Sequence, residues 1–335
     1  MAGRRLNVPL ILATVLASNI GAGATVGAAG LGYHDGLSAW WWNGSAAIGS
    51  VFLAFLIGPR IWRVAREHNL YTAGDYLELR YSPSVRAVVT SLIWLGTLSI
   101  LAGQLIAGSA VLTVVADVPR TTGIILSAAV MTVYFVAGGL LSSAWVNAVQ
   151  LVVLLIGFAI ALPMVISSAG GLAQVLAPTG APEGYASLGH STGPGSGWML
   201  MFALVPAFII SPGLMQKAYG ASSERAVRAG IGWQAAVLAL FAFVPALFGM
   251  AARATNPEIS DPNLVLPTVL AEQLPVTLGA LGLAAVFSAE VSTCDALLFM
   301  LATSLSKDMY KRFLRPDASD RQLLTVARIA SVAGA

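Results

Sequence analysis

Charged side chains are scarce in this chain: Asp, Glu, Lys and Arg make up only 10% of its 335 residues. Soluble globular domains carry about a quarter charged residues, so this composition argues against a soluble protein. Hydrophobic residues make up 57% of the chain. The sequence therefore predicts an integral protein of a lipid bilayer, all-α and crossing it several times. The net charge of +3 is explained by membrane topology and gives no indication of nucleic-acid binding.

Cysteine and histidine are almost missing as well. The single cysteine, Cys294, lies in an apolar run and can form no intrachain disulfide; we expect it to be a small buried packing residue. The three histidines are scattered at positions 34, 68 and 190 and form no metal-binding pattern. No nucleophile–base pair is recognisable either, so the sequence predicts neither an enzyme nor a bound cofactor.

Long apolar runs divide the chain into expected membrane spans. A helix needs about 20 apolar residues to cross about 30 Å of hydrocarbon. Eight runs reach that length, at residues 8–31, 38–60, 84–115, 121–140, 145–169, 197–217, 229–251 and 276–306. A ninth begins near Leu323 and is cut off at Ala335. No cleavage motif follows the N-terminal MAGRRLNV, so the first span is expected to be retained.

The distribution of Lys and Arg predicts the orientation. With a cytoplasmic N-terminus, sixteen of the eighteen basic residues fall on the inner side, and only Arg120 and Arg253 fall outside. Inner loops carry such an excess in proteins of the cell membrane. The sequence thus predicts an inner or plasma membrane protein with its N-terminus in the cytoplasm. Three consecutive tryptophans at 40–42 are expected to form an interfacial belt at the outer end of the second span.

The first span contains an unusual stretch at residues 13–30, ATVLASNIGAGATVGAAG. It is rich in glycine and small polar residues. A helix in lipid can loosen its backbone only where the freed groups face a cavity or other protein, and glycine permits non-helical dihedrals. We interpret Asn19–Gly23 as the break of a discontinuous helix whose carbonyls could meet a cation. Close helix packing through small residues explains this stretch alone about equally well.

The sixth span contains a second interruption. Pro206, Ser211, Pro212 and Gly213 fall inside it. Two interrupted spans at corresponding positions, five helices apart, are the pattern of inverted repeats with a binding site near the bilayer midplane. We therefore expect a first repeat at 1–169 with a broken first helix, an outer loop at 170–195, and a partial second repeat at 196–335.

The eighth span offers oxygen ligands without charge. Ser288, Ala289, Ser292 and Thr293 lie along one helical stripe, because residues three and four apart share a face. Hydroxyl and carbonyl oxygens suit a small, hard alkali cation, whereas Mg²⁺ or Ca²⁺ normally recruits carboxylates. The alternative is that these hydroxyls only bond the preceding turn or join two helices, as is common in membranes.

Several motifs resemble the sodium:solute symporter family, which includes sodium/proline, sodium/galactose and pantothenate carriers. These are the opening AGRRL, the stretch ASNIGAGATVG, the inner loop TAGDYLELRY (Thr72–Tyr81), Gly138-Gly139 with WVNAVQ (Trp145–Gln150), and AEVSTCDALLFMLATSLSKDMYKRFLR near the end. The resemblance covers essentially the whole chain, and the last passage is its most specific part. It implies the LeuT-type fold, a bundle of five plus five helices in inverted repeats.

The resemblance also implies a sodium site. Matching the family's motifs residue by residue assigns three backbone carbonyls, at Ala17, Ile20 and Ala289, and two hydroxyls, at Ser292 and Thr293. Three of these five residues, Ala289, Ser292 and Thr293, are ones that the chemistry of the eighth span had already indicated.

The substrate site of this fold lies beside the two helix breaks. The candidates for contact with a small polar solute are Ser18, Asn19, Gly23, Thr25, Asn43, Gln104, Ser211 and Gly213. Sugar carriers of the family have a glutamate where this chain has Asn43 and an aromatic gate where it has Gly213, and both departures argue against a hexose. Lys217 stands where an arginine is common and is expected to be a plain inner-end cation.

Two acids have no counterpart in the family pattern. Glu290 and Asp295 lie inside the eighth span, where an ionisable group is costly and is a functional candidate by default. They could hold a proton or bind a cationic substrate; pairing with a polar neighbour or simple protonation are the alternatives. Asn147 replaces the usual aspartate of the Trp-Thr-Asp motif, which puts the ordinary role of that motif in doubt.

The chain is shorter than the family pattern requires. The family has a further helix before the Ala-Gly-Arg motif and ten core helices, so the second repeat is expected to be incomplete and the chain truncated at both ends. The function implied is import of a small polar solute coupled to Na⁺, with sodium or proton coupling left open. The alternatives are a membrane-embedded sensor module of a signalling protein and an inactive fragment.

Overall fold

The computed structural model describes residues 4–319, 322–323, 325–326 and 329, without the side chains of 134–148 and 299. Its elements in that part of the chain are helices joined by turns and loops. The one pairing of extended backbone among the described residues is an isolated bridge between Leu6 and Ala221. The all-α prediction is therefore confirmed.

The first span is broken as predicted. Helix α1 (Val8–Asn19) begins at Asn7, whose side chain accepts a hydrogen bond from the Leu10 amide. It ends at Ile20, where φ −97° and ψ 84° leave the helical region. After residues 20–22, which we call the first-helix break, a π-helical turn η1 (Gly23–Gly27) leads into α2 (Ala28–Asp35).

A sharp turn at Gly36 separates the first span from the second. Gly36 has φ +67°, and a Cβ there would collide with the carbonyl oxygen of Tyr185, so glycine is needed for both conformation and space. The second span then runs through four helical segments: η2 (Gly36–Ala39), α3 (Trp40–Phe52), η3 (Leu53–Ile57) and α4 (Gly58–Glu67). It extends beyond the predicted 38–60 at its inner end.

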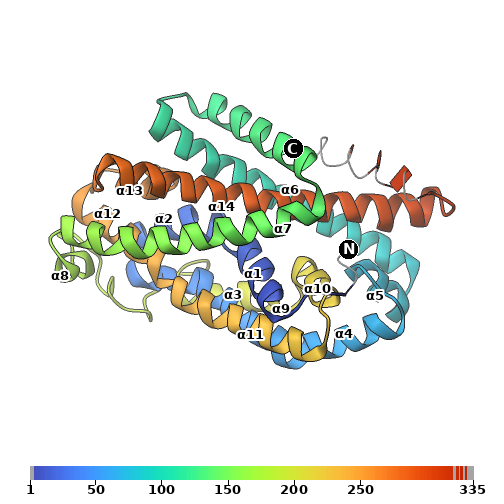
Figure 1. Ribbon diagram of the computed structural model, residues 1–335. Coiled ribbons are helices and arrows are strands. Elements are labelled where there is room, and N and C mark those ends of the chain that lie inside the picture. The colour runs from blue at the N-terminus through green and yellow to red at the C-terminus, as the bar shows by residue number, and fades with distance from the viewer. Residues whose placement is uncertain (1–3, 320–321, 324, 327–328, 330–335) are drawn as a thin grey trace.

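Capping residues start the next helices. Thr72 and Asp75 form a reciprocal capping box at the start of α5 (Ala73–Arg80). Ser82 caps α6 (Pro83–Ala116), which has proline at its first position. Helix α7 (Arg120–Ser168) contains both predicted spans 121–140 and 145–169, and Figure 1 draws its green ribbon as two arms that run in opposite directions.

The sixth span is also interrupted. After the outer loop, which contains α8 (Leu172–Leu176), the short η4 (Gly197–Met199) leads into α9 (Leu200–Ile209). The α9 helix ends before Ser211, and α10 (Pro212–Tyr219) begins at the following proline. Because proline lacks an amide proton and restricts the residue before it, the helix stops here and restarts.

The remaining helices form the second half of the bundle. They are α11 (Glu224–Phe241), α12 (Phe243–Thr255), η5 (Pro262–Leu264), α13 (Val265–Glu272), α14 (Val276–Thr303) and η6 (Ser304–Leu314). The predicted seventh span at 229–251 corresponds to α11 and α12 together, and the short α13 was not expected. The predicted ninth span, near Leu323, lies largely outside the described residues.

Length and composition select six helical stretches of the described residues as able to cross a membrane. Two shorter apolar helices, Val8–Asn19 and Arg120–Val133, accompany them. One of the six stretches, Gly23–Glu67, contains the turn at Gly36 and therefore holds the end of the first predicted span together with the second. The first-helix break shortens α1 to 12 residues.

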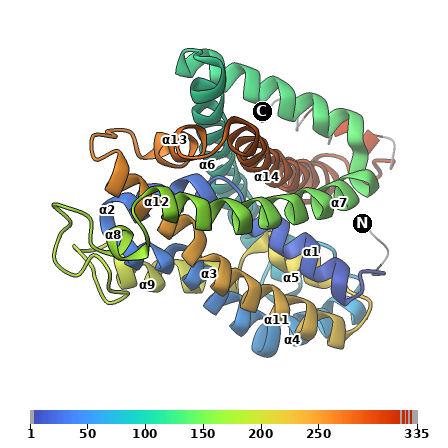
Figure 2. The ribbon, with the colours of Figure 1, turned by 60° about the vertical axis from the view of Figure 1, so that its left-hand side comes forward.

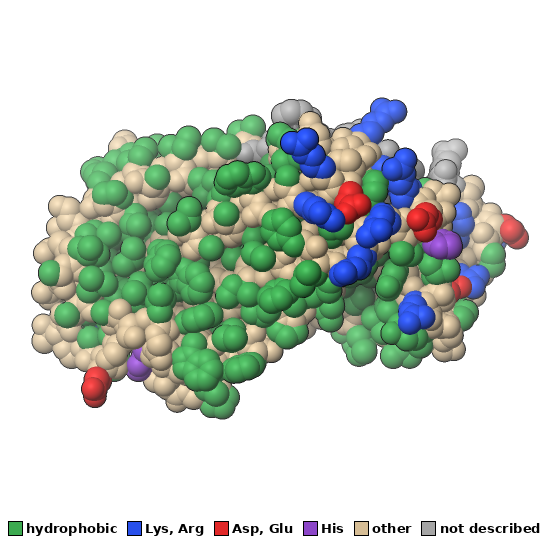
Figure 3. All heavy atoms as spheres, turned by 90° about the horizontal axis from the view of Figure 1, so that it is seen from below, with side chains coloured by type: hydrophobic (Ala, Val, Ile, Leu, Met, Phe, Trp, Pro, Cys, Tyr) green, Lys and Arg blue, Asp and Glu red, His purple; other side chains and the backbone are tan. Residues whose placement is uncertain are grey.

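The broken first helix lies in the middle of the bundle. Helix α1 packs on α11 and also contacts α7, α10 and α14, while α6 and α7 pack against α14. Figure 2 shows α1 between α7 and α11. Helix α2 packs mainly on α12. The outer surface is apolar: large side chains such as Leu92, Ile125 and Ile156 are more than half exposed. Figure 3 shows Lys and Arg gathered at one end of the face drawn there. An apolar belt of this kind is suited to lipid.

Candidate functional site

Helix α14 meets the first-helix break at Thr293. Its hydroxyl oxygen lies 3.3 Å from the carbonyl oxygen of Ala17 and 3.4 Å from that of Ile20. Both carbonyls lack an intrahelical partner of the usual kind because the helix stops at Ile20. Three of the five predicted sodium ligands are thus together.

The other two predicted ligands lie on the same stretch of α14. Ala289 and Ser292 are 4% and 3% exposed, so both belong to the protein interior. Ala289 stands one helical turn before Thr293, on the same face. The arrangement gathers neutral oxygen atoms from two helices at one place, which is chemistry for a hard monovalent cation.

Gly21 permits this close approach of α1 and α14. A Cβ built on Gly21 would collide with the Thr293 hydroxyl and would lie 2.8 Å from Oε1 of Gln104. Gln104 belongs to α6 and accepts a hydrogen bond of 2.9 Å from the amide of Ala22. A buried side chain thus satisfies one of the amide groups that the break leaves free. Three helices converge on the break.

The second span reaches the break from another side. The Asn43 side chain donates a hydrogen bond of 2.9 Å to the carbonyl of Ala24. Thr25 is fully buried, and its hydroxyl donates to the carbonyl of Gly21 at 2.9 Å. Trp42 lies over Gly23: a Cβ on that glycine would stand 3.6 Å from the indole. Asn43, Thr25, Gly23 and Gln104 are therefore brought together around the break.

Other substrate candidates are placed less centrally. Ser18 donates to its own helix, to the carbonyl of Val15 at 2.8 Å. The side-chain amide nitrogen of Asn19 is buried and has no hydrogen-bond partner in the described part of the chain. Ser211 and Gly213 stand at the interruption between α9 and α10, and among the described residues neither forms a hydrogen bond with the first-helix break.

Lys217 differs from its expected role as a plain inner-end cation. Its ammonium group donates a hydrogen bond of 2.6 Å to the carbonyl of Thr14 in α1. It also lies close enough to Asp295 of α14 for the two charges to interact. The acid predicted as a functional candidate therefore belongs to a link between α10, α1 and α14, one turn from the predicted sodium ligands.

Glu290 of α14 lies beside α6. Its side chain is fully buried, and both carboxyl oxygens lack a hydrogen-bond partner among the described residues. A Cβ on Gly108 of α6 would stand 3.3 Å from Glu290 Oε2 and 2.8 Å from the hydroxyl of Ser127, which is also buried and unpartnered. Two orphaned polar groups thus flank Gly108, one turn of α6 from Gln104. Unpaired groups in such a place are expensive.

Sequence reasoning missed two features near the site. The first is that the tryptophans at 40–42 make specific contacts within the bundle: Trp40 and Trp41 donate to the carbonyls of Ala239 and Leu188, and Trp42 packs at the break. The interfacial belt expected of them stays a prediction. All three are only half-exposed. Trp42 directly precedes Asn43, a predicted substrate-site residue, and this position could have indicated its place at the break.

The second missed feature is an ion cluster at the end of the bundle where α5, α6 and η6 meet. Arg86 at the start of α6 pairs with Asp75, with Glu78 and with Asp308. Asp308 also accepts a hydrogen bond of 2.8 Å from Thr72, and Glu78 pairs with Arg312. The cluster therefore ties α5 and α6 to η6, the continuation of α14. Asn147, whose role the sequence put in doubt, lies outside the described side chains.

Comparisons with known proteins identify the family of the chain. The family model of the sodium:solute symporter family matches residues 1–335. The chain is 28% identical to the sodium/pantothenate symporter of Escherichia coli over 95% of its length and 66% of that protein's. It is 24% identical to the sodium/glucose cotransporter of Vibrio parahaemolyticus, over 99% of the chain and 66% of the relative. The sodium/proline symporter of Haemophilus influenzae is 26% identical, with 98% and 68% covered.

The fold is similar to that of solved transporters. A Na⁺-coupled sialic acid symporter, solved in a substrate-bound outward-open state, superposes with a TM-score of 0.82 at 17% identity, over 99% of this chain and 72% of that one. A nucleobase-cation symporter in a closed conformation gives a TM-score of 0.65 at 14% identity, over 99% and 71%. This likeness shows the LeuT-type fold. The chain spans about two thirds of the length of the relatives named above. It is an integral membrane protein that belongs to the sodium:solute symporter family.

Proposed function

We propose that this chain is a sodium-coupled symporter, which imports a small polar organic solute across the cell membrane by alternating access. The observation that carries the proposal is the contact of the Thr293 hydroxyl with the carbonyls of Ala17 and Ile20. Oxygen ligands about 2.4 Å from a hard cation, within the range known for Ca²⁺, stand about 3.4 Å apart when they are at right angles. The spacing of these oxygens suits ligands of one ion.

The proposed mechanism is reciprocal coupling. Na⁺ bound by Ala17, Ile20, Ala289, Ser292 and Thr293 would hold α1 against α14 in the arrangement that also binds the solute. When the bundle rocks inward and α1 leaves α14, the ion loses ligands and both cargoes are released. Because coupling free energies are mutual, solute binding raises the affinity for Na⁺ by the same factor. The ion gradient drives the cycle, and neither enzymatic chemistry nor a cofactor is part of it.

We place the solute around the first-helix break. Asn43, Gln104, Gly23 and Thr25 surround it, and Trp42 adds an aromatic surface. Ser18, Asn19, Ser211 and Gly213 remain candidates at its margin. The departures at Asn43 and Gly213 argue against a hexose. Family relatives named for pantothenate and proline suggest the first solutes to try.

The orientation and the repeats are part of the same proposal. The N-terminus lies in the cytoplasm of a protein of the inner or plasma membrane, as the positions of sixteen basic residues favour. Residues 1–169 form one repeat and 196–335 the partial second, related by the interruptions of the first and sixth spans. The match to the named transporters covers nearly the whole of this chain. This favours a symporter over a sensor module.

The roles of the two acids can be separated by one pair of variants. Glu290→Gln keeps the volume and removes the charge beside Ser127; Asp295→Asn does the same beside Lys217. If either carboxylate holds a proton or a cationic solute, its variant loses uptake while Na⁺ binding persists. Unchanged uptake in both variants would show that neither carboxylate holds a proton or a cationic solute.

The main experiment measures Na⁺ binding and Na⁺-driven uptake in the full chain. Purified protein is heated in NaCl or in KCl, since an ion that binds the folded state raises the unfolding midpoint. Proteoliposomes with an inward Na⁺ gradient are then supplied with labelled pantothenate, proline or glucose. We expect a higher midpoint in NaCl and uptake of one polar solute only with the gradient. Equal midpoints in both salts and no gradient-dependent uptake would overturn the proposal.

A further inference from the structure

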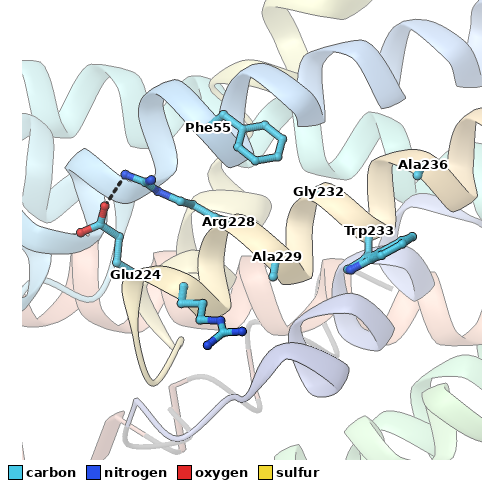
Figure 4. A pocket seen from close by; sticks show the side chains of 8 residues that line it. Phe55, Glu224, Arg228, Ala229, Gly232, Trp233 and Ala236 are labelled. Carbon is cyan, nitrogen blue, oxygen red and sulfur yellow. Dashed lines mark hydrogen bonds and ion pairs between the residues drawn. The ribbon is translucent and has the colours of Figure 1, made fainter.

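A hollow lies on the outside of the bundle, beside α11. It has a volume of about 610 Å³ and lies between α11 and η3. Figure 4 shows its polar end at Glu224 and Arg228 and its apolar end at Trp233 and Ala236, with Phe55 above. Its lining residues are Phe55, Glu224, Arg225, Arg228, Ala229, Gly232, Trp233 and Ala236.

The polar end carries an excess of positive charge. Arg228 donates to the carboxylate of Glu224 at 2.6 Å, and Arg63 of α4 lies 3.7 Å from the same carboxylate. Arg225 is exposed and has no ion pair in the described part of the chain. Two guanidinium groups therefore share one carboxylate and a third has no ion pair, so this end carries an excess of positive charge that suits an anion.

The apolar end is open to the lipid. Phe55 is 55% exposed and Trp233 is 64% exposed. Gly232 lies between them: a Cβ there would stand 3.1 Å from the Phe55 ring, so the glycine keeps the groove open. Leu240, one turn beyond Ala236, is 73% exposed. The groove thus continues along a surface that faces hydrocarbon.

The length of the groove matches a lipid that spans headgroup and acyl regions. From Arg225 to Ala236 is eleven residues of α11, which at 1.5 Å per residue is about 16 Å. Arginine binds phosphate in a bidentate manner, basic clusters at the membrane surface attract anionic lipids, and tryptophan prefers the membrane interface. A water-soluble anion would contact only the basic half of the groove, whereas a phospholipid would contact both halves.

We propose that this groove binds an anionic glycerophospholipid. Its phosphate lies against Arg225 and Arg228, and one acyl chain passes over Gly232 between Phe55 and Trp233. The lipid thereby contacts the helix that supports α1: a Cβ on Gly230 would stand 2.7 Å from Ile11 Cβ and 3.2 Å from the carbonyl oxygen of Val8. Occupancy stabilises the packing of α11 on the broken helix.

Native mass spectrometry of the full chain tests the proposal without any transport assay, so its outcome does not depend on the proposed function. Detergent-purified protein is titrated with dioleoylphosphatidylglycerol or with dioleoylphosphatidylcholine. The test variant is Arg225→Gln with Arg228→Gln. The matched control is Lys311→Gln with Arg315→Gln, which removes the same charge from exposed positions at the end of η6. A second variant, Gly232→Leu, fills the apolar half and keeps both arginines.

We expect the wild-type chain to bind one phosphatidylglycerol at least tenfold more tightly than phosphatidylcholine. The double arginine variant and Gly232→Leu should each lose most of that preference, and the control should stay within twofold of wild type. Equal losses in the control would mean unspecific attraction and would overturn the site. Displacement of the lipid by equimolar glycerol 3-phosphate would overturn it too, because the pocket would then recognise a free phosphate.

Discussion

The hydroxyl oxygen of Thr293 lies 3.3 Å from the carbonyl oxygen of Ala17, across the interface between α14 and the broken first helix. This distance is at the long end of O–H···O hydrogen bonds, which are commonly 2.7–2.8 Å. The hydroxyl is therefore only loosely held by the backbone, and its lone pairs remain available. Such a weak contact suits a hydroxyl that bonds to the backbone when no ion is bound and to the ion when one is.

Thr293→Ala tests the assignment of this hydroxyl. The variant removes one cation ligand, so we expect Na⁺-dependent uptake to need at least a tenfold higher Na⁺ concentration. Ser304→Ala is the matched control. Ser304 and Thr293 are both 5% exposed, but Ser304 lies on η6, away from the break. Uptake as a function of Na⁺ concentration is the measurement. Equal effects of the two variants would refute the site.

Gly21→Ala tests the close approach of the two helices. The added methyl group would occupy the place of the Thr293 hydroxyl and crowd Gln104, so α1 and α14 must move apart. We expect the stabilisation by Na⁺ to be largely lost in thermal unfolding. Gly103→Ala on α6 is the control, because its Cβ would meet nothing within 4 Å. A Na⁺-induced shift that is as large in Gly21→Ala as in the wild type would contradict this geometry.

Asp308→Asn tests the ion cluster that ties η6 to α5 and α6. Arg86 and Asp308 have side chains 8% and 4% exposed, and breaking a buried pair costs about 3–5 kcal/mol. Because Arg86 keeps Asp75 and Glu78 as partners, we expect the free energy of unfolding to fall by about 3 kcal/mol, the lower end of that range. The readout is the thermal unfolding midpoint in detergent. Asp317→Asn, an exposed acid two turns beyond the cluster, should leave the midpoint unchanged; if Asp308→Asn does the same, the cluster carries no stability.

Much of the architecture was predictable from local chemistry. Glycine at 21 and 23 and proline at 212 favour breaks in an apolar helix, and the pairing of the two interruptions five helices apart predicted them together. The contact of Thr293 with Ala17 was expected only through the family resemblance. The stripe of small and hydroxyl-bearing residues on α14 is, by itself, as compatible with a helix–helix contact as with a cation site.

Other features depend on distances that a sequence does not encode. Lys217 looked like a terminal cation, yet its reach to Thr14 depends on how α10 crosses α1. The hydrogen bonds of Trp40 and Trp41 depend on carbonyls that α11 and the loop before α9 bring to them. Hydropathy likewise does not show where helical segments join, as they do within Gly23–Glu67.

Glu78 gives the ion cluster a defined dependence on pH. Partial burial raises the pKa of this carboxyl, but hydrogen bonds from Arg86 and Arg312 outweigh it and hold the pKa below the ordinary value. A carboxyl with a lowered pKa stabilises the folded state fully above its ordinary pKa of about 4.3, and this contribution is lost as the pH falls through the lower folded value. The cluster should therefore weaken in acid and not in base.

The prediction is a difference between wild type and Glu78→Gln that changes with pH. At pH 7 the variant should unfold at a lower temperature, because Arg86 and Arg312 lose a charged partner. As the pH is lowered from 7 toward 3, the wild-type carboxyl takes up a proton and the gap between the two midpoints should narrow. Glu67→Gln removes an exposed carboxylate outside the cluster and should match wild type at both values. A gap that is constant from pH 7 to pH 3 would show that Glu78 contributes by packing and not by charge.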